Sequence, residues 1–237
     1  MEQVPNYADL RQTSFCAYCA GKTETRDHVP SKVFLDEPYP DNLPVVPACQ
    51  CCNESFSLDE QYVACLIECV INGSVKPDDV KREKIRRILE RKPTLVSKFR
   101  EALQETAEGK SFRVETERVR NVILKLAMGH ALFELNEPQF GKPSIVNCVP
   151  LLSMAREVLE DFETPPQSSV WPEVGSRASQ RLVVDEPGAS LWIVAQPGRY
   201  RYLTSVGHGV LVRIVISEYL ACEVAWRQDW RRGEFES

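Results

Sequence analysis

The chain has 237 residues, of which 43% are hydrophobic and 27% are charged, and its formal net charge at pH 7 is −5. These values are ordinary for a globular protein with a real core and one large or two small domains. No apolar run approaches the roughly 20 residues that span a bilayer. The N-terminal stretch MEQVPNYADLRQ lacks the basic start and apolar segment of a signal peptide. We therefore expect a cytoplasmic protein that does not bind a membrane.

The first region of the chain, residues 1–75, is marked by paired cysteines. Cys16 and Cys19 form one pair with two-residue spacing, and Cys49 and Cys52 form another. Nine cysteines without a secretion signal fit metal binding in a reducing compartment better than disulfides. Two such knuckles can present four thiolates to one structural Zn²⁺. The alternative is that all four are buried free cysteines.

Cys51 stands between two of these ligands and could compete with Cys52. We favour Cys49 and Cys52, because two residues between ligands is the usual spacing in a zinc knuckle. The other cysteines lie in apolar segments and are expected in the core: Cys65, Cys69, Cys148 and Cys222.

Secondary structure in the first two regions is predicted from apolar spacing. LPVVP, residues 43–47, is a short strand candidate, and residues 53–71 have the spacing of a helix that ends at the NGS sequence. The second region, residues 76–140, is predicted to be helical, with a break at Pro93. Its helices are expected over residues 76–92, 94–106 and 117–136.

The third region, residues 141–237, has a different pattern. A proline- and serine-containing connector is followed by four stretches of strand-like sequence, with Gly207-His208-Gly209 as a hairpin turn. The strands are expected over residues 191–196, 200–205, 210–217 and 219–226. The whole chain is therefore predicted to be an α+β protein in three regions, with an antiparallel sheet in the last.

The cysteine pairs enclose a rare histidine. Within residues 14–62 the motifs CAYC, DHVPSK, DNLPVVPAC and CCN follow one another in this order, and His28 lies in the second. This arrangement resembles the bacterial HNH endonucleases, also called ββα-metal nucleases. The resemblance implies a zinc-stapled, treble-clef-like ββα core, in which two strands and a helix hold a catalytic cation.

The resemblance also assigns roles to single residues. His28 corresponds to the general base, and an unperturbed histidine pKa of about 6.5 suits proton transfer near neutral pH. Asp27 corresponds to a ligand of the catalytic cation, and Asn42 to the residue that holds the loop and the His28 ring. Asn53 takes the place of the final histidine as second ligand, which favours Mg²⁺ or Mn²⁺ over softer metals. Glu60, on the same helix, could add a carboxylate or merely be solvated.

Basic charge is concentrated next to this motif region. Residues 1–80 contain 5 Lys/Arg and 13 Asp/Glu, whereas residues 81–125 contain 14 and 7. A basic arm could offset the repulsion between an acidic catalytic region and a phosphate backbone. The alternative is an ordinary solvated helix face. The candidate nucleic-acid contacts are Lys32, Lys81, Arg82, Arg86 and Arg91.

The sequence thus leads to a functional hypothesis with two alternatives. We expect a metal-dependent endonuclease that acts on DNA, and the family resemblance suggests defence against phage or mobile DNA. The alternatives are a zinc-stabilised module that binds nucleic acid or protein without catalysis, and a nuclease for RNA. Residues 141–237 could set substrate choice, form a homodimer or bind a regulatory protein. Of the other histidines, His130 is expected in the core and His208 in a turn.

Overall fold

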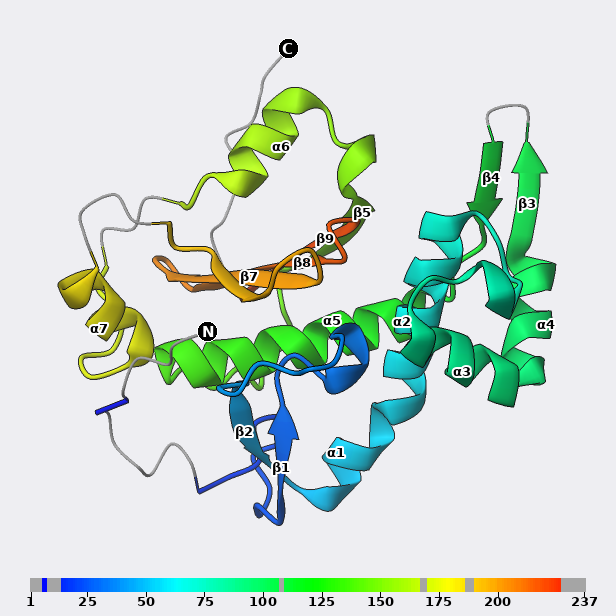
Figure 1. The fold of residues 1–237 in the computed structure, drawn as a ribbon. Coiled ribbons are helices and arrows are strands. Elements are labelled where there is room, and N and C mark those ends of the chain that lie inside the picture. Colours follow the sequence, from blue (N-terminus) through cyan, green and yellow to red (C-terminus); the bar gives the residue numbers. More distant parts are fainter. Residues whose placement is uncertain (1–5, 8–13, 107–108, 167–169, 186–189, 227–237) are drawn as a thin grey trace.

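The computed structural model describes residues 6–7, 14–106, 109–166, 170–185 and 190–226 (Figure 1). Within these ranges the protein is a mixed α+β fold, and its named strands all pair in antiparallel fashion. The predicted fold class is confirmed in this coarse form. None of the described helices combines the length and the apolar character that a membrane crossing requires.

The N-terminal part is an antiparallel strand pair followed directly by helices. β1 (Thr25–His28) pairs with β2 (Val45–Ala48), which confirms the strand expected near residue 45 with slightly shifted bounds. α1 (Gln50–Ser55) begins two residues after β2, and α2 (Ser57–Asn72) continues from it. The single helix predicted here is divided at Phe56. Because Thr25 pairs with Ala48, this order places both cysteine pairs at the same end of the strand pair.

The loop that joins β1 to β2 is anchored in the core. It contains a short 3-10 helix, Lys32–Phe34, and both Phe34 and Leu35 are buried. Val29, directly after His28, is also fully buried. A Cβ atom at Gly129 would lie 2.6 Å from a methyl carbon of Val29, so only glycine permits this close approach. The position of the loop after His28 therefore depends on the helix that contains Gly129, Thr116–His130.

The middle of the chain is helical with one interruption. α4 (Pro93–Ala102) is followed directly by a β-hairpin. The helix predicted over residues 94–106 is therefore wrong beyond Ala102. After Leu103 the next large apolar residue is Phe112, and a longer helix would have had no apolar face to bury. The elements of this part are α3 (Glu83–Arg91), α4 (Pro93–Ala102), β3 (Leu103–Thr106), β4 (Gly109–Phe112) and α5 (Thr116–His130), which continues as a π-helix over Ala131–Leu135.

The C-terminal part is built on a five-stranded sheet in the order β5-β9-β8-β7-β6. All four predicted strands are present, and the turn predicted at residues 207–209 joins two of them. The sequence did not predict β5 or the helices α6 and α7, because these elements are short and lie next to prolines or polar turns. The elements are β5 (Ile145–Pro150), α6 (Arg156–Glu163), α7 (Arg177–Val184), β6 (Ile193–Gln196), β7 (Tyr200–Val206), β8 (Val210–Ile216) and β9 (Leu220–Trp226).

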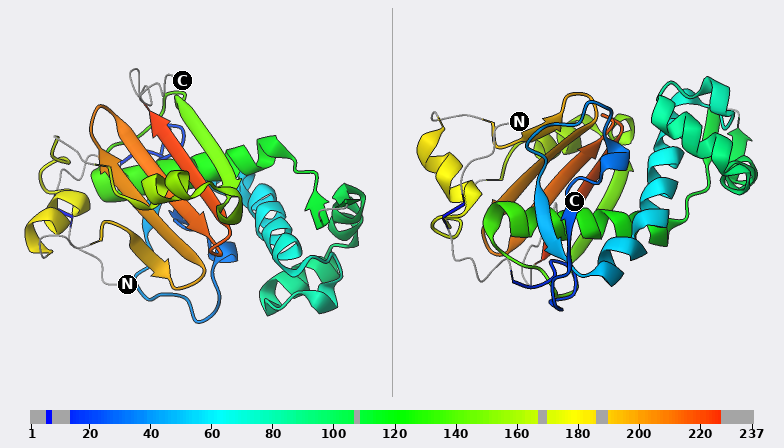
Figure 2. Two further views of the ribbon diagram at one scale, coloured as in Figure 1. Left: turned by 90° about the horizontal axis from the view of Figure 1, so that it is seen from above. Right: turned by 60° about the horizontal axis from the view of Figure 1, so that its bottom comes forward.

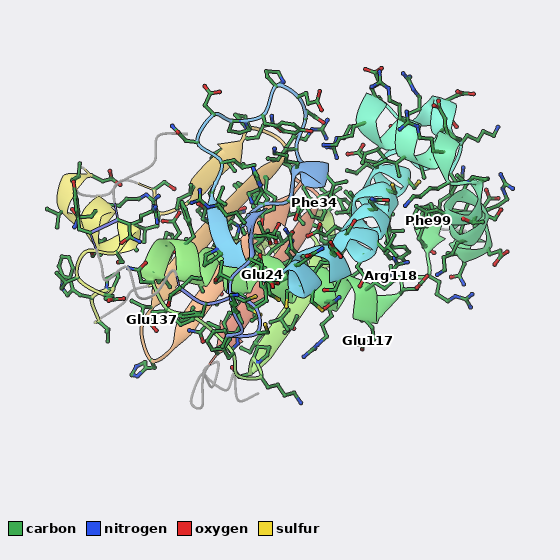
Figure 3. All side chains as sticks on the ribbon, turned by 90° about the horizontal axis from the view of Figure 1, so that it is seen from below. Glu24, Phe34, Phe99, Glu117, Arg118 and Glu137 are labelled. Atoms are coloured by element: carbon green, nitrogen blue, oxygen red, sulfur yellow. The ribbon has the colours of Figure 1, made fainter. Side chains whose placement is uncertain are left out.

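α5 is the central element of the molecule. It lies between the five-stranded sheet and the β1–β2 pair, with α2 crossing one of its ends (Figures 1 and 2). At that crossing Arg118, which is labelled in Figure 3, donates from Nε to Asp59 Oδ1 at 2.6 Å. One continuous apolar core runs from Ala17 to Trp226 and includes residues of all three predicted regions.

Candidate active site and cysteine cluster

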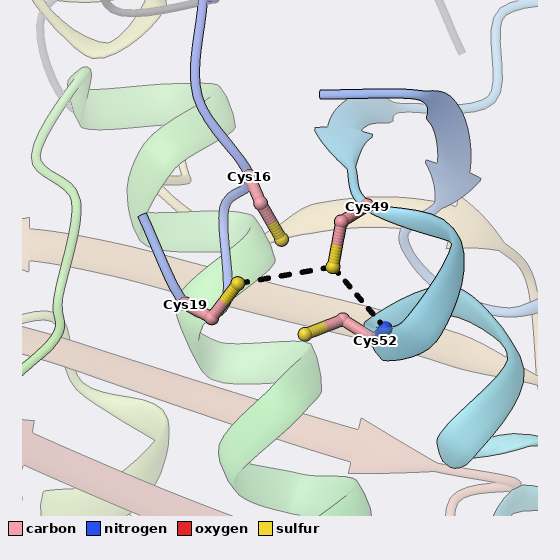
Figure 4. Close-up of side chains that lie close together, drawn as sticks. All are labelled: Cys16, Cys19, Cys49 and Cys52. Atoms are coloured by element: carbon pink, nitrogen blue, oxygen red, sulfur yellow. Dashed lines mark hydrogen bonds between the residues drawn. The ribbon is translucent and has the colours of Figure 1, made fainter. Parts of the chain in front are cut away.

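Four cysteines converge beside the strand pair. Cys16 and Cys19 come from the turn before β1, whereas Cys49 and Cys52 come from the end of β2 and the first turn of α1 (Figure 4). Their four Sγ atoms lie within 4.8 Å of one another. The predicted pairing of the two knuckles is therefore confirmed in space. Cys51 is exposed and does not belong to the cluster.

The backbone around these cysteines has the form that a sulfur-bound metal needs. The Cys16 N–H donates to the Gly21 carbonyl at 2.8 Å, which closes a tight turn. The Tyr18 N–H approaches the Cys16 sulfur at 3.5 Å, and the Cys52 N–H approaches the Cys49 sulfur at 3.3 Å. Such N–H groups stabilise thiolate charge. Four clustered cysteine sulfurs fit zinc by ligand type and number, so the cluster is consistent with a structural zinc site.

His28 lies at the end of β1, close to the cysteine cluster in the chain but on a different surface. Its ring is partly buried and lines a pocket of about 300 Å³ together with Ser31, Lys32 and Lys84. Burial lowers the pKa of His28, the positive charge of Lys32 lowers it further, and Asp27 opposes this change. A neutral imidazole in a pocket with two lysines can accept a proton next to a bound anion.

Asp27 also lines this pocket, and its carboxylate is buried in a polar cluster. Tyr18 donates its hydroxyl proton to Asp27 Oδ2 at 2.7 Å, and Lys125 Nζ lies 2.7 Å from the same oxygen. Lys125 also pairs with Glu60, which accepts a hydrogen bond from Ser31 at 2.5 Å. The cluster therefore joins β1, α2 and α5 through charge-assisted hydrogen bonds.

Lys125 and Tyr18 were not identified from the sequence as parts of this site. The one available signal was a lysine inside the apolar helix sequence VILKLAMGHALFEL, because a buried lysine normally needs a charged partner. The spacing of residues in the sequence does not show which carboxylates pair with this lysine.

The two asparagines of the motif lie apart from the Asp27 carboxylate contacts. Asn53, on α1, donates from Nδ2 to Thr25 Oγ1 at 3.1 Å and approaches the Arg26 carbonyl at 3.4 Å. It thus joins α1 to β1. Asn42 is exposed in the turn that precedes β2.

These contacts do not by themselves form the predicted site for a divalent cation at Asp27 and Asn53. Oδ2 of Asp27 is occupied by Tyr18 and Lys125, and the Asn53 amide is directed to strand β1. Among the described residues, the four cysteines are the one group in which three or more His, Cys, Asp or Glu ligand atoms converge. The catalytic Mg²⁺ or Mn²⁺ stays a prediction.

The predicted basic residues divide into two groups. Lys32, Lys81 and Arg91 are exposed, and Arg86 is partly exposed with its guanidinium 3.8 Å from Glu90. Arg82, in contrast, is buried. Its guanidinium binds Asp36 Oδ1 at 2.7 Å, Glu68 Oε1 at 3.4 Å and two backbone carbonyls of the β1–β2 loop. It is therefore a structural contact of that loop, and it also contributes to the lining of a pocket.

A second pocket of about 450 Å³ adjoins the His28 pocket, and the two share Lys84 and Ile88 in their linings. The second pocket is also lined by Lys81, Arg87 and Arg91. Lys84 and Arg87 were not among the predicted contacts. Lys84 donates to the Lys32 carbonyl at 2.7 Å, so it connects α3 to the loop after His28. Basic side chains therefore extend from the His28 pocket along α3, with Asp36, Glu37 and Glu83 also in the lining.

Comparison with protein-family models finds no match to this chain. Comparisons with curated protein sequences and with solved structures likewise find no significant match.

Proposed function

We propose that the protein is an HNH-type endonuclease that hydrolyses phosphodiester bonds in DNA, with His28 as the general base and a zinc ion bound by the four cysteines. The observation that carries the proposal is the placement of His28. It stands at the end of the first strand of a strand–strand–helix unit and lines a pocket with Lys32 and Lys84. The cysteine cluster joins the beginning and the end of the same unit.

The residues of the pocket can perform the proton transfer that hydrolysis requires. His28 accepts a proton from the attacking water, because burial and the Lys32 charge lower its pKa and keep the ring neutral near pH 7. Lys32 and Lys84 attract the phosphate and offset the charge that develops on it. Lys81 and Arg91, in the adjoining pocket, are placed to bind neighbouring phosphates of the strand.

The four cysteines have a structural role in this proposal. A zinc ion would hold the turn before β1 against the start of α1, and so fix the end of the strand pair at which Thr25 pairs with Ala48. Cys19 Sγ and Cys49 Sγ are 3.8 Å apart, a spacing that two ligands of one tetrahedral ion can have.

The test compares cleavage of supercoiled plasmid by wild type, His28→Ala and His208→Ala, with Mg²⁺ or Mn²⁺ present. His208 is an exposed turn residue and serves as the matched control. Loss of a general base typically costs about 10²–10⁴-fold in rate. We expect this loss for His28→Ala at unchanged zinc content, and no loss for His208→Ala.

Equal cleavage by His28→Ala and wild type would rule out this site as the nuclease centre. If neither protein cleaves DNA but both bind it equally, the zinc-stabilised binding module becomes the better explanation. An RNA of the same sequence, assayed in parallel, separates the DNA nuclease from an RNA nuclease.

A further inference from the structure

The ammonium group of Lys125 lies between two carboxylates that line the candidate catalytic pocket. Its Nζ is 2.7 Å from Asp27 Oδ2, forms an ion pair with Glu60 Oε1 and lies 3.2 Å from Ser31 Oγ. The lysine side chain is 1% exposed, and the side chains of Asp27 and Glu60 are 10% and 11% exposed. Lys125 is therefore enclosed, while both carboxylates reach the pocket.

The cluster has a defined charge and fixed positions. Two carboxylates and one ammonium carry a formal net charge of −1, and Tyr18 donates a further hydrogen bond to Asp27. Each partner comes from a different element: Asp27 from β1, Glu60 from α2 and Lys125 from α5. Because the three elements pack in one core, none of these charges can move away without disturbing it.

A cation that bridged Asp27 and Glu60 would need the space that Lys125 occupies. A hard divalent cation binds carboxylate oxygens at about 2.0–2.6 Å, and the ammonium already lies at hydrogen-bond distance from one oxygen of each carboxylate. Two positive charges in the same gap repel strongly where burial reduces screening.

We infer that Lys125 is a built-in cation that holds Asp27 and Glu60 together and excludes a divalent cation from the space between them. Lys125 is thus a positioning residue: it fixes the carboxylate directly before His28 without touching the pocket itself. The inference rests on the proposed function only for the role of the neighbouring pocket. Lys32 and Lys84 supply the positive charge of this pocket, which Asp27 and Glu60 also line.

Binding of Mn²⁺ to the zinc-loaded full-length protein, followed by electron paramagnetic resonance, tests this inference without an activity assay. Lys125→Met leaves two carboxylates and no ammonium, so it should gain one Mn²⁺ site at least about 10-fold tighter than any in wild type. The double variant Lys125→Met/Asp27→Asn should lose this gain. Lys142→Met removes an exposed lysine charge and should bind Mn²⁺ as wild type does.

A second measurement covers the case in which Lys125→Met does not fold, since removal of one partner from a buried ion pair is strongly destabilising. Wild type and Glu60→Gln should then show the same weak Mn²⁺ binding. The inference is overturned if wild type binds one Mn²⁺ tightly and Glu60→Gln weakens that binding 10-fold or more. It is also overturned if folded Lys125→Met binds Mn²⁺ no better than wild type. Neither result depends on whether the protein cleaves DNA.

Discussion

Two histidines of this chain show how strongly placement determines the chemistry of one residue type. His28 lines a pocket, whereas His130 is fully buried under the C-terminal sheet. The His130 ring stacks on Tyr202 with a centroid distance of 3.7 Å, and its Nε2 lies 2.9 Å from the Tyr200 hydroxyl. This confirms His130 as a core residue. Burial lowers the pKa of His130 to about 3.

The buried neutral His130 should make stability depend on pH. The unfolded chain binds a proton near pH 6.5 and the folded chain does so only near pH 3, so stability falls as pH decreases between these values. Tyr200 and Tyr202 do not titrate in this range, because burial raises their pKa well above 10. Between pH 6.5 and 5.5, wild type should lose about 1 kcal/mol more than His130→Gln in urea unfolding. Equal losses in the two proteins would contradict this expectation, and exposed His208→Gln should behave as wild type.

Loss of one cysteine of the cluster tests the zinc site. Cys19→Ser should reduce the bound zinc from about one per chain to a small fraction, because a hydroxyl is a poor replacement for a thiolate ligand. The segment from residue 14 to residue 70 should then lose protection from proteolysis. Cys51→Ser is the matched control, since Cys51 lies outside the cluster and is exposed. A stable wild-type protein without zinc would contradict the structural role.

Residues whose role follows from local spacing could be predicted from the sequence. Residues whose role depends on partners far away in the chain could not. The CxxC spacing was sufficient to predict the cluster of Cys16 with Cys49. Arg82 reads as part of a basic arm in sequence, yet it binds Asp36, which lies 46 positions away. Lys125 binds Asp27 across the core. Neither partner can be obtained from helical periodicity, because both depend on how α3 and α5 pack.

At the scale of single elements, α3 has one core face and one charged face. Ile85 and Leu89 are buried, while Arg87 and Arg91 are exposed and line the second pocket. The regular helical spacing of Ile85 and Leu89 was readable in the sequence. The hairpin β3–β4 was not, because four-residue strands carry too little alternation to compete with the preceding helical pattern.

The charged face of α3, together with Lys81 just before the helix, should determine the salt dependence of DNA binding. In a His28→Ala background, Lys81→Ala/Arg91→Ala should lower the slope of log affinity against log salt by about 1.8, since each lost phosphate contact in duplex DNA contributes about 0.9. Lys98→Ala/Arg100→Ala removes the same charge from exposed positions on α4 and should leave the slope unchanged. If the two double variants gave the same slope of log affinity against log salt, the α3 face would be assigned to a partner other than DNA.

At the scale of the whole molecule, the C-terminal sheet holds the loop that follows His28. Gln196, at the end of β6, accepts from the Asp36 N–H at 2.8 Å and donates to the Asp36 carbonyl at 3.0 Å. Arg199 donates from Nε to the Asp36 carboxylate at 2.5 Å, and Arg82 binds its other oxygen. The C-terminal region, for which the sequence left several roles open, therefore contacts the β1–β2 loop directly.

The electrostatics of this connection favour an ionised Asp36. Burial alone would raise the pKa of Asp36, but hydrogen bonds and charges from Arg82 and Arg199 outweigh burial and lower it. Both arginines also contact Glu68, whose pKa is raised by burial in spite of them. One network of charges thus connects the loop to α2, α3 and the sheet. Substitution of Arg199, at the sheet end of this network, tests the connection.

Arg199→Met should loosen the loop without changing the rest of the sheet. Arg199 is 28% exposed and Asp36 keeps its contact with Arg82, so we expect a stability loss of about 1–2 kcal/mol. Hydrogen exchange measured by mass spectrometry should become faster in residues 31–40. Arg201→Met is the matched control, because Arg201 lies on β7 but pairs with Glu163 and Glu218. It should speed exchange near α6 instead. If Arg199→Met left exchange in residues 31–40 as slow as in Arg201→Met, the Arg199 contact would not be what holds this loop.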